Sequence, residues 1–407
     1  MTHRLPFLPF WILTPLLIGL LLVLGALGAC SDEESYEFAV ILPLTGEWSI
    51  YGDPIRKGVE LALEDVRSRD LPYEVTIEVL DSKSDPTQAA ELLRRAFRDG
   101  AFAAVGGVTS ESALAMVPVA VEMERLLVSP SASSPKLAGI SRYFFRVFPS
   151  DFREGTTMGN FVSEKLNITN LVILAADTTY ARGISTVFED AFESYGHEVM
   201  GTIMYPAGTE DLSEYVRQAL ELDPQAIYVA DFAQPVSRIL AEAKHQGFDG
   251  KLLTTSAFNA PDILAAAGKN AEAVILTQTA FEPEASENPK VRSFVQAYQA
   301  KYGEIPGTYA AHGYDALHVL VDALGKLNLR SPGEMLKGIR SLDSDYSGVT
   351  GAIRFDERGD VGQYPRVYIL QDGVFEDYDK VREENRQKLL DRLDEIRRRR
   401  QQQLQRQ

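Results

Sequence analysis

The feature that most constrains the fold is a regular alternation of short apolar segments with longer segments of helical periodicity. Apolar segments such as Phe38–Leu42 and Leu171–Leu174 have the length and composition of buried strands. A segment such as Ile55–Val66 then places its apolar residues on one face of a helix. Strand–helix alternation predicts parallel sheets with helices on both faces, and a break near residues 146–151 separates two such runs. We therefore expect an α/β protein with two similar, doubly wound domains.

The first thirty residues predict export. Arg4 precedes an uncharged, leucine-rich run that ends at Ala29, as in a secretory signal, and Leu27-Gly28-Ala29-Cys30 resembles the lipobox of bacterial lipoproteins. We expect a signal peptide over 1–29, lipidation at Cys30 and a lipidated linker over 30–36. An uncleaved transmembrane helix is the alternative, because the run is long enough to span a bilayer. Either interpretation leaves the rest of the chain outside the cytoplasm, anchored to a membrane.

The composition argues against several classes of function. A formal net charge of −17 disfavours nucleic acid as a partner. The sequence has no Gly-x-Ser-x-Gly elbow, phosphate-binding loop or dinucleotide fingerprint, and its five histidines lack zinc-type spacing. Because Cys30 is the only cysteine, thiolate catalysis and internal disulfides are excluded. We expect no cofactor, no metal and no enzymatic activity; an esterase or amidase using a serine would lack a visible base.

Two polar turns mark a candidate binding site. Gly106–Ser112 and Ser129–Pro135 each follow a short apolar run and are rich in hydroxyl side chains. Neighbouring strands would bring both turns to one edge of a sheet, where doubly wound folds bind ligands. Backbone N–H groups at a helix start, together with serine and threonine, suit a small anion such as a carboxylate.

Several short motifs, in this order and spacing, resemble the leucine/isoleucine/valine-type periplasmic binding proteins. The similarity covers roughly residues 36–378. The motifs are Pro43-Leu44-Thr45-Gly46, Tyr51-Gly52, Asp85-Pro86, Gly106–Ser112, Ser129-Pro130-Ser131-Ala132, Phe145-Arg146, Pro149-Ser150-Asp151, Tyr180-Ala181-Arg182-Gly183, Gly208–Asp211, Tyr314–Leu317, Thr350-Gly351, Phe355-Asp356 and Gly359-Asp360.

The resemblance implies two Rossmann-like lobes of doubly wound parallel sheets, joined by three crossovers and closing on a small solute (the type I periplasmic binding fold). Lobe 1 would comprise 37–148 and 281–345, and lobe 2 would comprise 149–280 and 346–378. Residues 379–407 would form a charged helical tail, for which contact with anionic lipid or a partner is one option.

The resemblance also implies the ligand contacts. Ser110, Ser131 and Ser133 would hold the α-carboxylate and α-ammonium of an amino acid. The other expected ligand-binding residues are Tyr51, Thr109, Ala132, Tyr180, Phe232, Ser256 and Tyr309.

One position departs from the family pattern. Ser256 stands where the family offers an acidic residue to the ligand ammonium, and a serine brings no charge. Asp231 or Asp177 could supply one, or both could simply be solvated. Amino acids, amides, short carboxylates and aromatic acids therefore all remain candidate ligands.

The function expected from these features is solute binding for an ABC importer, with an ABC permease as protein partner. The alternative is a ligand-sensing or envelope-regulatory protein that reuses the same fold without transport.

Overall fold

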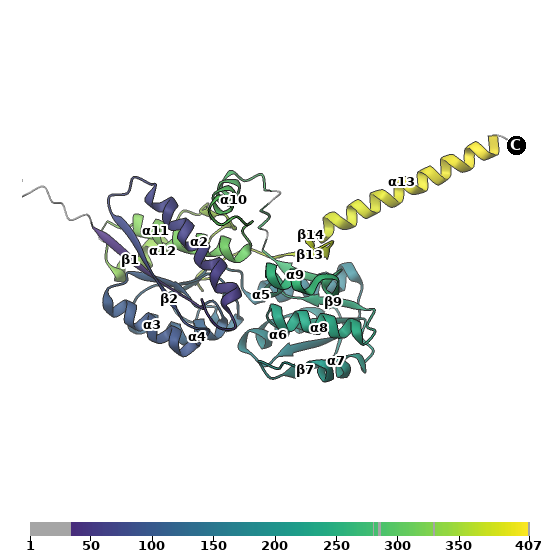
Figure 1. Cartoon of the computed structure of the whole chain (residues 1–407), viewed down its shortest axis with the longest axis horizontal. Coiled ribbons are helices and arrows are strands. Elements are labelled where there is room, and N and C mark those ends of the chain that lie inside the picture. Colours follow the sequence, from purple (N-terminus) through teal and green to yellow (C-terminus); the bar gives the residue numbers. More distant parts are fainter. Residues whose placement is uncertain (1–33, 280, 284–285, 329, 406–407) are drawn as a thin grey trace, which may run out of the picture.

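The protein folds into two α/β lobes that lie side by side (Figure 1). The computed structural model describes residues 34–279, 281–283, 286–328 and 330–405. The predicted signal peptide and Cys30 lie outside these residues. The first lobe has a five-stranded sheet in the order β2-β1-β3-β4-β5. Its strands are β1 (Ser35–Leu42), β2 (Glu74–Asp81), β3 (Ala103–Gly106), β4 (Leu127–Ser129) and β5 (Phe144–Arg146).

Helices cover both faces of the first sheet. The pair α3 and α4 packs together, and α2 packs against α11, which returns from much later in the chain. The bounds are α2 (Ser49–Arg67), α3 (Pro86–Asp99), α4 (Ser110–Glu122), α10 (Pro289–Tyr302), α11 (Thr308–Gly325) and α12 (Met335–Arg340). The predicted start of α3 agrees with the structure, because the Asp85 side chain accepts a hydrogen bond from Thr87 N at 2.7 Å.

The return of α11 to the first lobe depends on two glycines. A Cβ on Gly58 of α2 would lie 2.0 Å from Ala310 O, and one on Gly313 of α11 would lie 2.5 Å from Ile55 O. The two helices therefore approach backbone to backbone, which no larger residue permits at these positions. This contact joins segments more than two hundred residues apart into one lobe.

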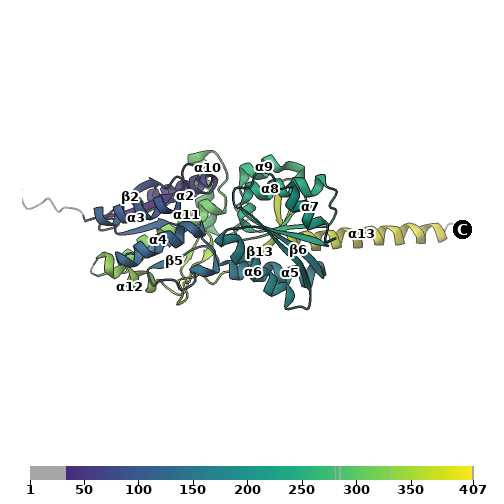
Figure 2. The same ribbon diagram turned by 90° about the horizontal axis from the view of Figure 1, so that it is seen from below.

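The second lobe has a seven-stranded sheet in the order β14-β13-β10-β9-β8-β6-β7. In Figure 2, α5 and α6 lie on one face of this sheet and α7, α8 and α9 on the other. The strands are β6 (Asn170–Ala176), β7 (Glu198–Tyr205), β8 (Ala226–Ala230), β9 (Lys251–Thr254), β10 (Ile275–Gln278), β13 (Arg366–Gln371) and β14 (Val374–Asp377). The helices are α5 (Asp151–Phe161), α6 (Thr179–Glu193), α7 (Ser213–Leu220), α8 (Ala233–His245) and α9 (Pro261–Ala267).

The prediction of two doubly wound α/β lobes is confirmed, with one difference. The sheets are parallel except at one edge, where β13 pairs antiparallel with β10 and β14 antiparallel with β13. The hairpin of β13 and β14 follows the third crossing between lobes, so no helix separates it from its neighbour strand. Without that helix, the alternation in the sequence could not predict its direction.

The division between lobes differs from the predicted one near residue 346. The predicted boundary assigns 346–378 to the second lobe, but the first part of this segment packs on the first. Val349 N and Thr350 N each donate to the Asp315 carboxylate of α11 at 2.8 Å, and Phe355 packs edge-on against Phe145. The chain therefore crosses to the second lobe only after Val361, shortly before β13.

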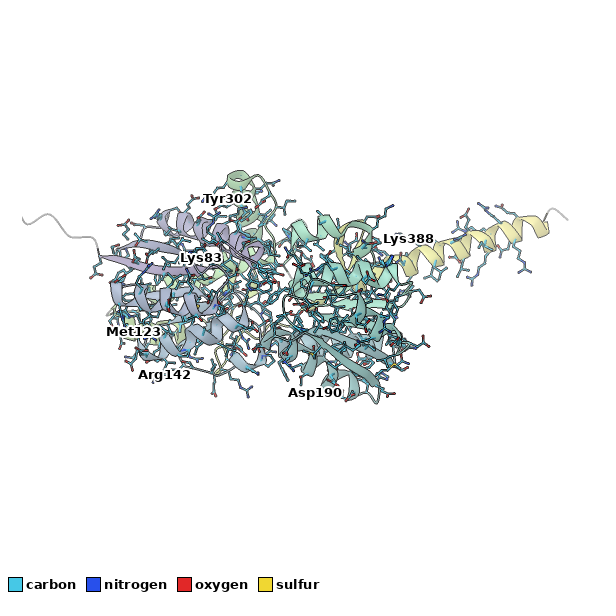
Figure 3. The ribbon with its side chains drawn as sticks, turned by 60° about the horizontal axis from the view of Figure 1, so that its bottom comes forward. Lys83, Met123, Arg142, Asp190, Tyr302 and Lys388 are labelled. Carbon is cyan, nitrogen blue, oxygen red and sulfur yellow. The ribbon has the colours of Figure 1, made fainter. Side chains whose placement is uncertain are left out.

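A long helix, α13 (Tyr378–Gln405), extends from the second lobe into solvent (Figures 1 and 2). Figure 3 shows Lys388 on this helix, with Asp190 on the second lobe and Lys83 and Met123 on the first. Among the residues that the structure describes, α13 contacts the body at its start, through Tyr378 against Phe161, Asp379 with Lys165 and the buried Val381. Of the helices in residues 34–405 that are described, none is both long and apolar enough to cross a bilayer.

Candidate functional site

A pocket lies where the two lobes meet. The structure brings all ten of the predicted ligand-binding residues to this pocket, seven from the first lobe and three from the second. The lining residues are Tyr51, Val108, Thr109, Ser110, Ser131, Ala132, Ser133, Phe148, Tyr180, Phe232, Ser256, Ala257 and Tyr309. Val108, Phe148 and Ala257 line the pocket in addition to the ten predicted residues.

The hydroxyls at the start of α4 line the pocket and already accept hydrogen bonds from the protein. Thr109 Oγ1 caps the helix by accepting from Ser112 N at 3.2 Å, and Ser110 Oγ accepts from Ser134 N at 3.1 Å. Each oxygen is thus occupied as an acceptor by the protein, which leaves its O–H free to donate. Together with the N–H groups at the N-terminus of a thirteen-residue helix, they favour an anionic group.

The second polar turn is fixed to the first by hydroxyl groups. Ser129 Oγ donates to Gly107 O and Ser131 Oγ donates to Val108 O, both at 2.8 Å. Because the Ser131 hydroxyl donates its hydrogen to Val108 O, this side chain presents only lone pairs to the pocket. The two turns therefore form one rigid wall with donors on one side and acceptors on the other.

Arg146, at the end of β5, supports this wall from behind. Its Nη1 donates to Ser134 O at 2.9 Å and contacts Ala132 O at 3.4 Å. Its Nε and Nη2 donate to the Asp360 carboxylate at 2.7 and 2.9 Å. Arg146 is fully buried. The Asp360 carboxylate balances its charge, and the carboxylate and the two carbonyls accept hydrogen bonds from its N–H groups.

Ser256 of the second lobe is hydrogen-bonded to a buried carboxylate, that of Glu154. Its N and Oγ donate to the two carboxylate oxygens of Glu154 at 2.6 and 2.8 Å, and Thr277 Oγ1 donates to Glu154 at 2.8 Å. Glu154 lies on α5 and is 1% exposed. Burial raises the pKa of Glu154, and the hydrogen bonds from Ser256 and Thr277 offset part of that rise. A carboxylate therefore stands directly behind the serine.

A second buried carboxylate, Asp151, begins the same helix one turn earlier. Its backbone N donates to Ser133 O at 2.8 Å, but neither carboxylate oxygen has a hydrogen-bond partner among the described residues. Burial raises the pKa of Asp151 well above its ordinary range, and the charge of Glu154 raises it further. The Ser133 side chain and Arg146 act in the opposite direction.

Asp151 and Glu154, which lie behind the lining residues Ser133 and Ser256, were not among the residues predicted from the sequence. Pro149-Ser150-Asp151 was visible as a motif, but it also has the pattern of a helix start, and Ser150 does cap α5. The signal that could have found both carboxylates is their spacing: three residues apart on a helix, they lie on the same face.

Aromatic side chains from both lobes close the remainder of the pocket. Tyr51 crosses between lobes: its OH donates to Ala257 O at 3.0 Å and accepts from Ala233 N at 2.9 Å. Trp48 and Phe232 face each other at 4.3 Å between ring centroids. Because its hydrogen is donated to Ala257 O, the Tyr51 hydroxyl does not donate to a ligand. The two lobes are therefore in direct contact beside the pocket.

The two acidic residues considered in place of Ser256 do not line the pocket. Asp231 is buried and accepts from Tyr205 OH and Phe232 N, both at 2.7 Å; burial raises its pKa to about 6. Asp177 is exposed and pairs with Arg182 at 2.6 Å. Both carboxylates are occupied by neighbours in the second lobe, so neither supplies the expected charge. No cluster of three or more metal-ligating side chains occurs within the described part of the chain.

Comparison with known proteins agrees with the fold and the position of the pocket. The family model described as "Periplasmic binding protein" matches residues 35–372. A leucine-, isoleucine-, valine-, threonine- and alanine-binding protein of Pseudomonas aeruginosa is 24% identical, over 81% of this chain and 88% of that protein.

Two solved structures are similar over nearly their whole length. A leucine-binding protein of Thermotoga maritima is 29% identical with a TM-score of 0.80, over 84% of this chain and 97% of that one. A branched-chain amino acid transporter substrate-binding protein of Streptococcus pneumoniae, solved with isoleucine, is 26% identical with a TM-score of 0.77, over 84% and 98%. Family members of this type are substrate-binding proteins rather than enzymes, which confirms the expectation from the sequence. The chain belongs to the periplasmic binding proteins, in the family of the leucine/isoleucine/valine-binding type.

Proposed function

We propose that this protein is an extracytoplasmic, lipid-anchored solute receptor of an ABC importer that binds an amino acid or a closely related small carboxylate or amide. The observation that carries the proposal is the pocket between the lobes, lined by side chains from both. One wall presents the free O–H groups of Thr109 and Ser110 at a helix N-terminus, and aromatic rings close the remaining space. A small molecule with one polar end and an apolar body fits such a pocket.

The ligands of similar proteins indicate which ligands to test first. The Thermotoga protein is named for leucine and the Streptococcus protein was solved with isoleucine, and both share the two-lobe fold over more than four-fifths of this chain. An apolar side chain on the ligand agrees with the aromatic rings of Tyr180, Phe232 and Tyr309 in the pocket lining. We therefore propose L-leucine, L-isoleucine and L-valine as the first ligands to test.

Closure of the lobes is the proposed mechanism of capture. Contacts between the lobes that would form on closure are the two hydrogen bonds of Tyr51 and the bond from Thr179 N to Glu111 Oε1 at 2.7 Å. A ligand that contacts both walls favours the closed form by its differential affinity. The closed form is then the one offered to the permease.

Isothermal titration calorimetry of the mature protein tests the solute-binding role. The titrants are the twenty L-amino acids, their amides, and short and aromatic acids including benzoate. Ser110→Ala is expected to weaken the best titrant about tenfold, the effect of one hydrogen bond to a charged group. The control Ser163→Ala removes a buried hydroxyl that donates to Gly159 O in the second lobe. It is expected to leave the affinity for the same titrant unchanged. If no titrant binds, the proposal fails.

Fractionation tests the anchor. Wild-type protein is expected in the membrane fraction, and Cys30→Ala is expected to lose lipid labelling with radioactive palmitate. Co-purification with a permease from detergent-solubilised membranes tests the transporter partner. A wild-type protein that carries no lipid contradicts the anchor without affecting ligand binding.

A further inference from the structure

We propose that the outer part of α13, residues 382–402, lies on the surface of a bilayer that carries anionic lipid. The proposal goes beyond the proposed function and does not depend on it. It concerns a helix that contributes no residue to the pocket and that leaves the second lobe at the end far from β1 (Figure 1). Figure 3 shows Lys388 on this helix, clear of both lobes.

The apolar residues of the outer part form one exposed stripe. Leu389, Leu393 and Ile396 have the spacing of a single helix face, and Leu390 borders them. The four side chains are between 41% and 58% exposed, although leucine and isoleucine are usually buried. The contacts that the described residues show between α13 and the body lie before residue 382. The stripe is therefore free to be covered by a partner from outside the chain.

Arginines share the side of the helix that carries the stripe. At 3.6 residues per turn, four of them lie within about 40° of Leu393 around the helix axis. They are Arg382, Arg386, Arg397 and Arg400. Acidic residues lie on the opposite side (Glu384, Asp391 and Glu395) or at one border (Glu383 and Asp394). One side of the helix thus combines apolar contact with positive charge, which suits the interface of an anionic bilayer.

The ion pairs within the helix leave these arginines available. Arg386 pairs with Glu383 at 2.6 Å and Arg397 with Asp394 at 3.2 Å, yet the two arginine side chains are 64% and 76% exposed. Exposed pairs of this kind contribute little, so a lipid phosphate can replace the carboxylate. The stem of an arginine can meanwhile lie along apolar surface while its guanidinium reaches the headgroups.

The charge of α13 indicates an anionic partner. The helix carries nine basic and six acidic side chains, in a chain whose net charge is −17. An anionic surface would repel the acidic body but attract this helix, which stands away from it. Because α13 is not apolar enough to cross a bilayer, it would lie on the surface.

A second copy of the chain fits the stripe less well. In a parallel pair, Arg386 and Arg400 would face the same residues of the other helix. In an antiparallel pair with Leu389 opposite Ile396, Arg386 would instead face Arg399. Both arrangements place like charges together. The stripe also covers about two turns, whereas a coiled coil needs at least three heptads.

Sedimentation with vesicles tests the proposal. The protein is produced from Ser31 onward, which keeps every described residue and removes Cys30, so no acyl chain can hold it to lipid. Vesicles of phosphatidylcholine with about a third phosphatidylglycerol are expected to bind it at least about tenfold more strongly than phosphatidylcholine alone at low salt. About 0.5 M NaCl should remove most of this difference. Truncation after Val381 is expected to abolish the binding.

A matched pair of variants separates the helix from the overall charge. Arg397→Gln combined with Arg400→Gln is expected to weaken binding to the anionic vesicles about tenfold or more. Arg95→Gln combined with Arg98→Gln removes the same charge from exposed positions of α3 and is expected to leave the binding unchanged.

Tryptophan fluorescence tests which side of the helix meets the lipid. Leu393→Trp is expected to shift its emission to the blue on addition of the anionic vesicles. Gln402→Trp, half a turn round the helix from Leu393, is expected to shift much less. The protein from Ser31 onward, whose own tryptophan is Trp48, gives the baseline.

Several outcomes would overturn the proposal. They are absence of vesicle binding at low salt, equal binding to both kinds of vesicle, and equal effects of the two pairs of arginine substitutions. A dimer that is lost on truncation after Val381, in a protein that binds no vesicles, would assign the helix to a second copy instead. None of these results bears on solute binding, which is measured separately.

Discussion

Arg146 and Asp360 form an ion pair with two hydrogen bonds at the base of the pocket, with the arginine fully buried and the aspartate 9% exposed. The two residues lie just before the first and the last crossing between the lobes. The same guanidinium holds the carbonyl of Ser134 in the ligand-side turn. One cation therefore connects the segments that cross between the lobes to the turn that lines the pocket.

Asp360→Asn is expected to destabilise the protein by about 3–5 kcal/mol, because it leaves the Arg146 charge buried without its carboxylate. Urea denaturation followed by circular dichroism measures the change. The control is Asp379→Asn, which breaks the exposed pair with Lys165 and is expected to cost at most about 1 kcal/mol. Equal effects of the two substitutions would contradict a special role for the buried pair.

Tyr51→Phe is expected to weaken binding of the best solute about tenfold with little change in stability of the separate lobes. The substitution keeps the ring but removes the hydroxyl that bonds Ala257 O and Ala233 N across the cleft. Its two former partners would be buried unpaired only in the closed form, so closure becomes less favourable. Small-angle scattering with saturating solute should show a larger radius of gyration than wild type; an identical profile and affinity would argue against the bridge.

Glu111→Ala is expected to weaken solute binding several-fold, and Glu111→Gln less. The Glu111 side chain accepts from Thr179 N at 2.7 Å, so a first-lobe carboxylate caps the N-terminus of α6 in the second lobe. Glutamine retains the acceptor but loses the favourable charge at the helix terminus. Titration calorimetry of the two variants separates the hydrogen bond from the charge, and equal losses would assign the whole effect to the charge.

Asp151→Asn is expected to raise the stability of the protein by an amount that depends on pH, because burial disfavours the ionised carboxyl. The folded-state pKa of Asp151 is raised above its unfolded value of about 3.9, so its contribution to stability is complete below that value and is lost as pH rises through the folded pKa. The variant should therefore match wild type near pH 4 and melt at a higher temperature near pH 8. Scanning calorimetry of the ligand-free proteins checks this, and a constant difference at all pH values would be inconsistent with it.

Truncation after Val381 is expected to leave both the melting temperature and the affinity unchanged. Residues 382–402 are exposed along the whole of this stretch of α13, and the contacts with the body come from Tyr378, Asp379 and Val381. A helix without tertiary contacts contributes little to the stability of the domain. Truncation before Tyr378 is the matched change that should lower the melting temperature.

The alternation of apolar and helical segments was sufficient to predict the two α/β lobes, because a parallel sheet is buried by helices on both of its faces. The order of the motifs was sufficient to name the ten residues that meet at the pocket, since strand ends such as those before Thr109 and Ser131 share one edge of a sheet. What these residues bind stays a prediction.

Only the tertiary structure decided how the charges are arranged. Ser256 has Glu154 behind it, and the Asp151 carboxylate has no hydrogen-bond partner within the part of the chain that the structure describes. Both depend on which side chains of α5 face the neighbouring turns. Contacts between residues a hundred positions apart are set by packing, which the local pattern of a single segment does not contain. The same reason explains why residues 347–361 joined the first lobe and why β13 and β14 run antiparallel: both follow from long-range contacts, with Asp315 and with β10.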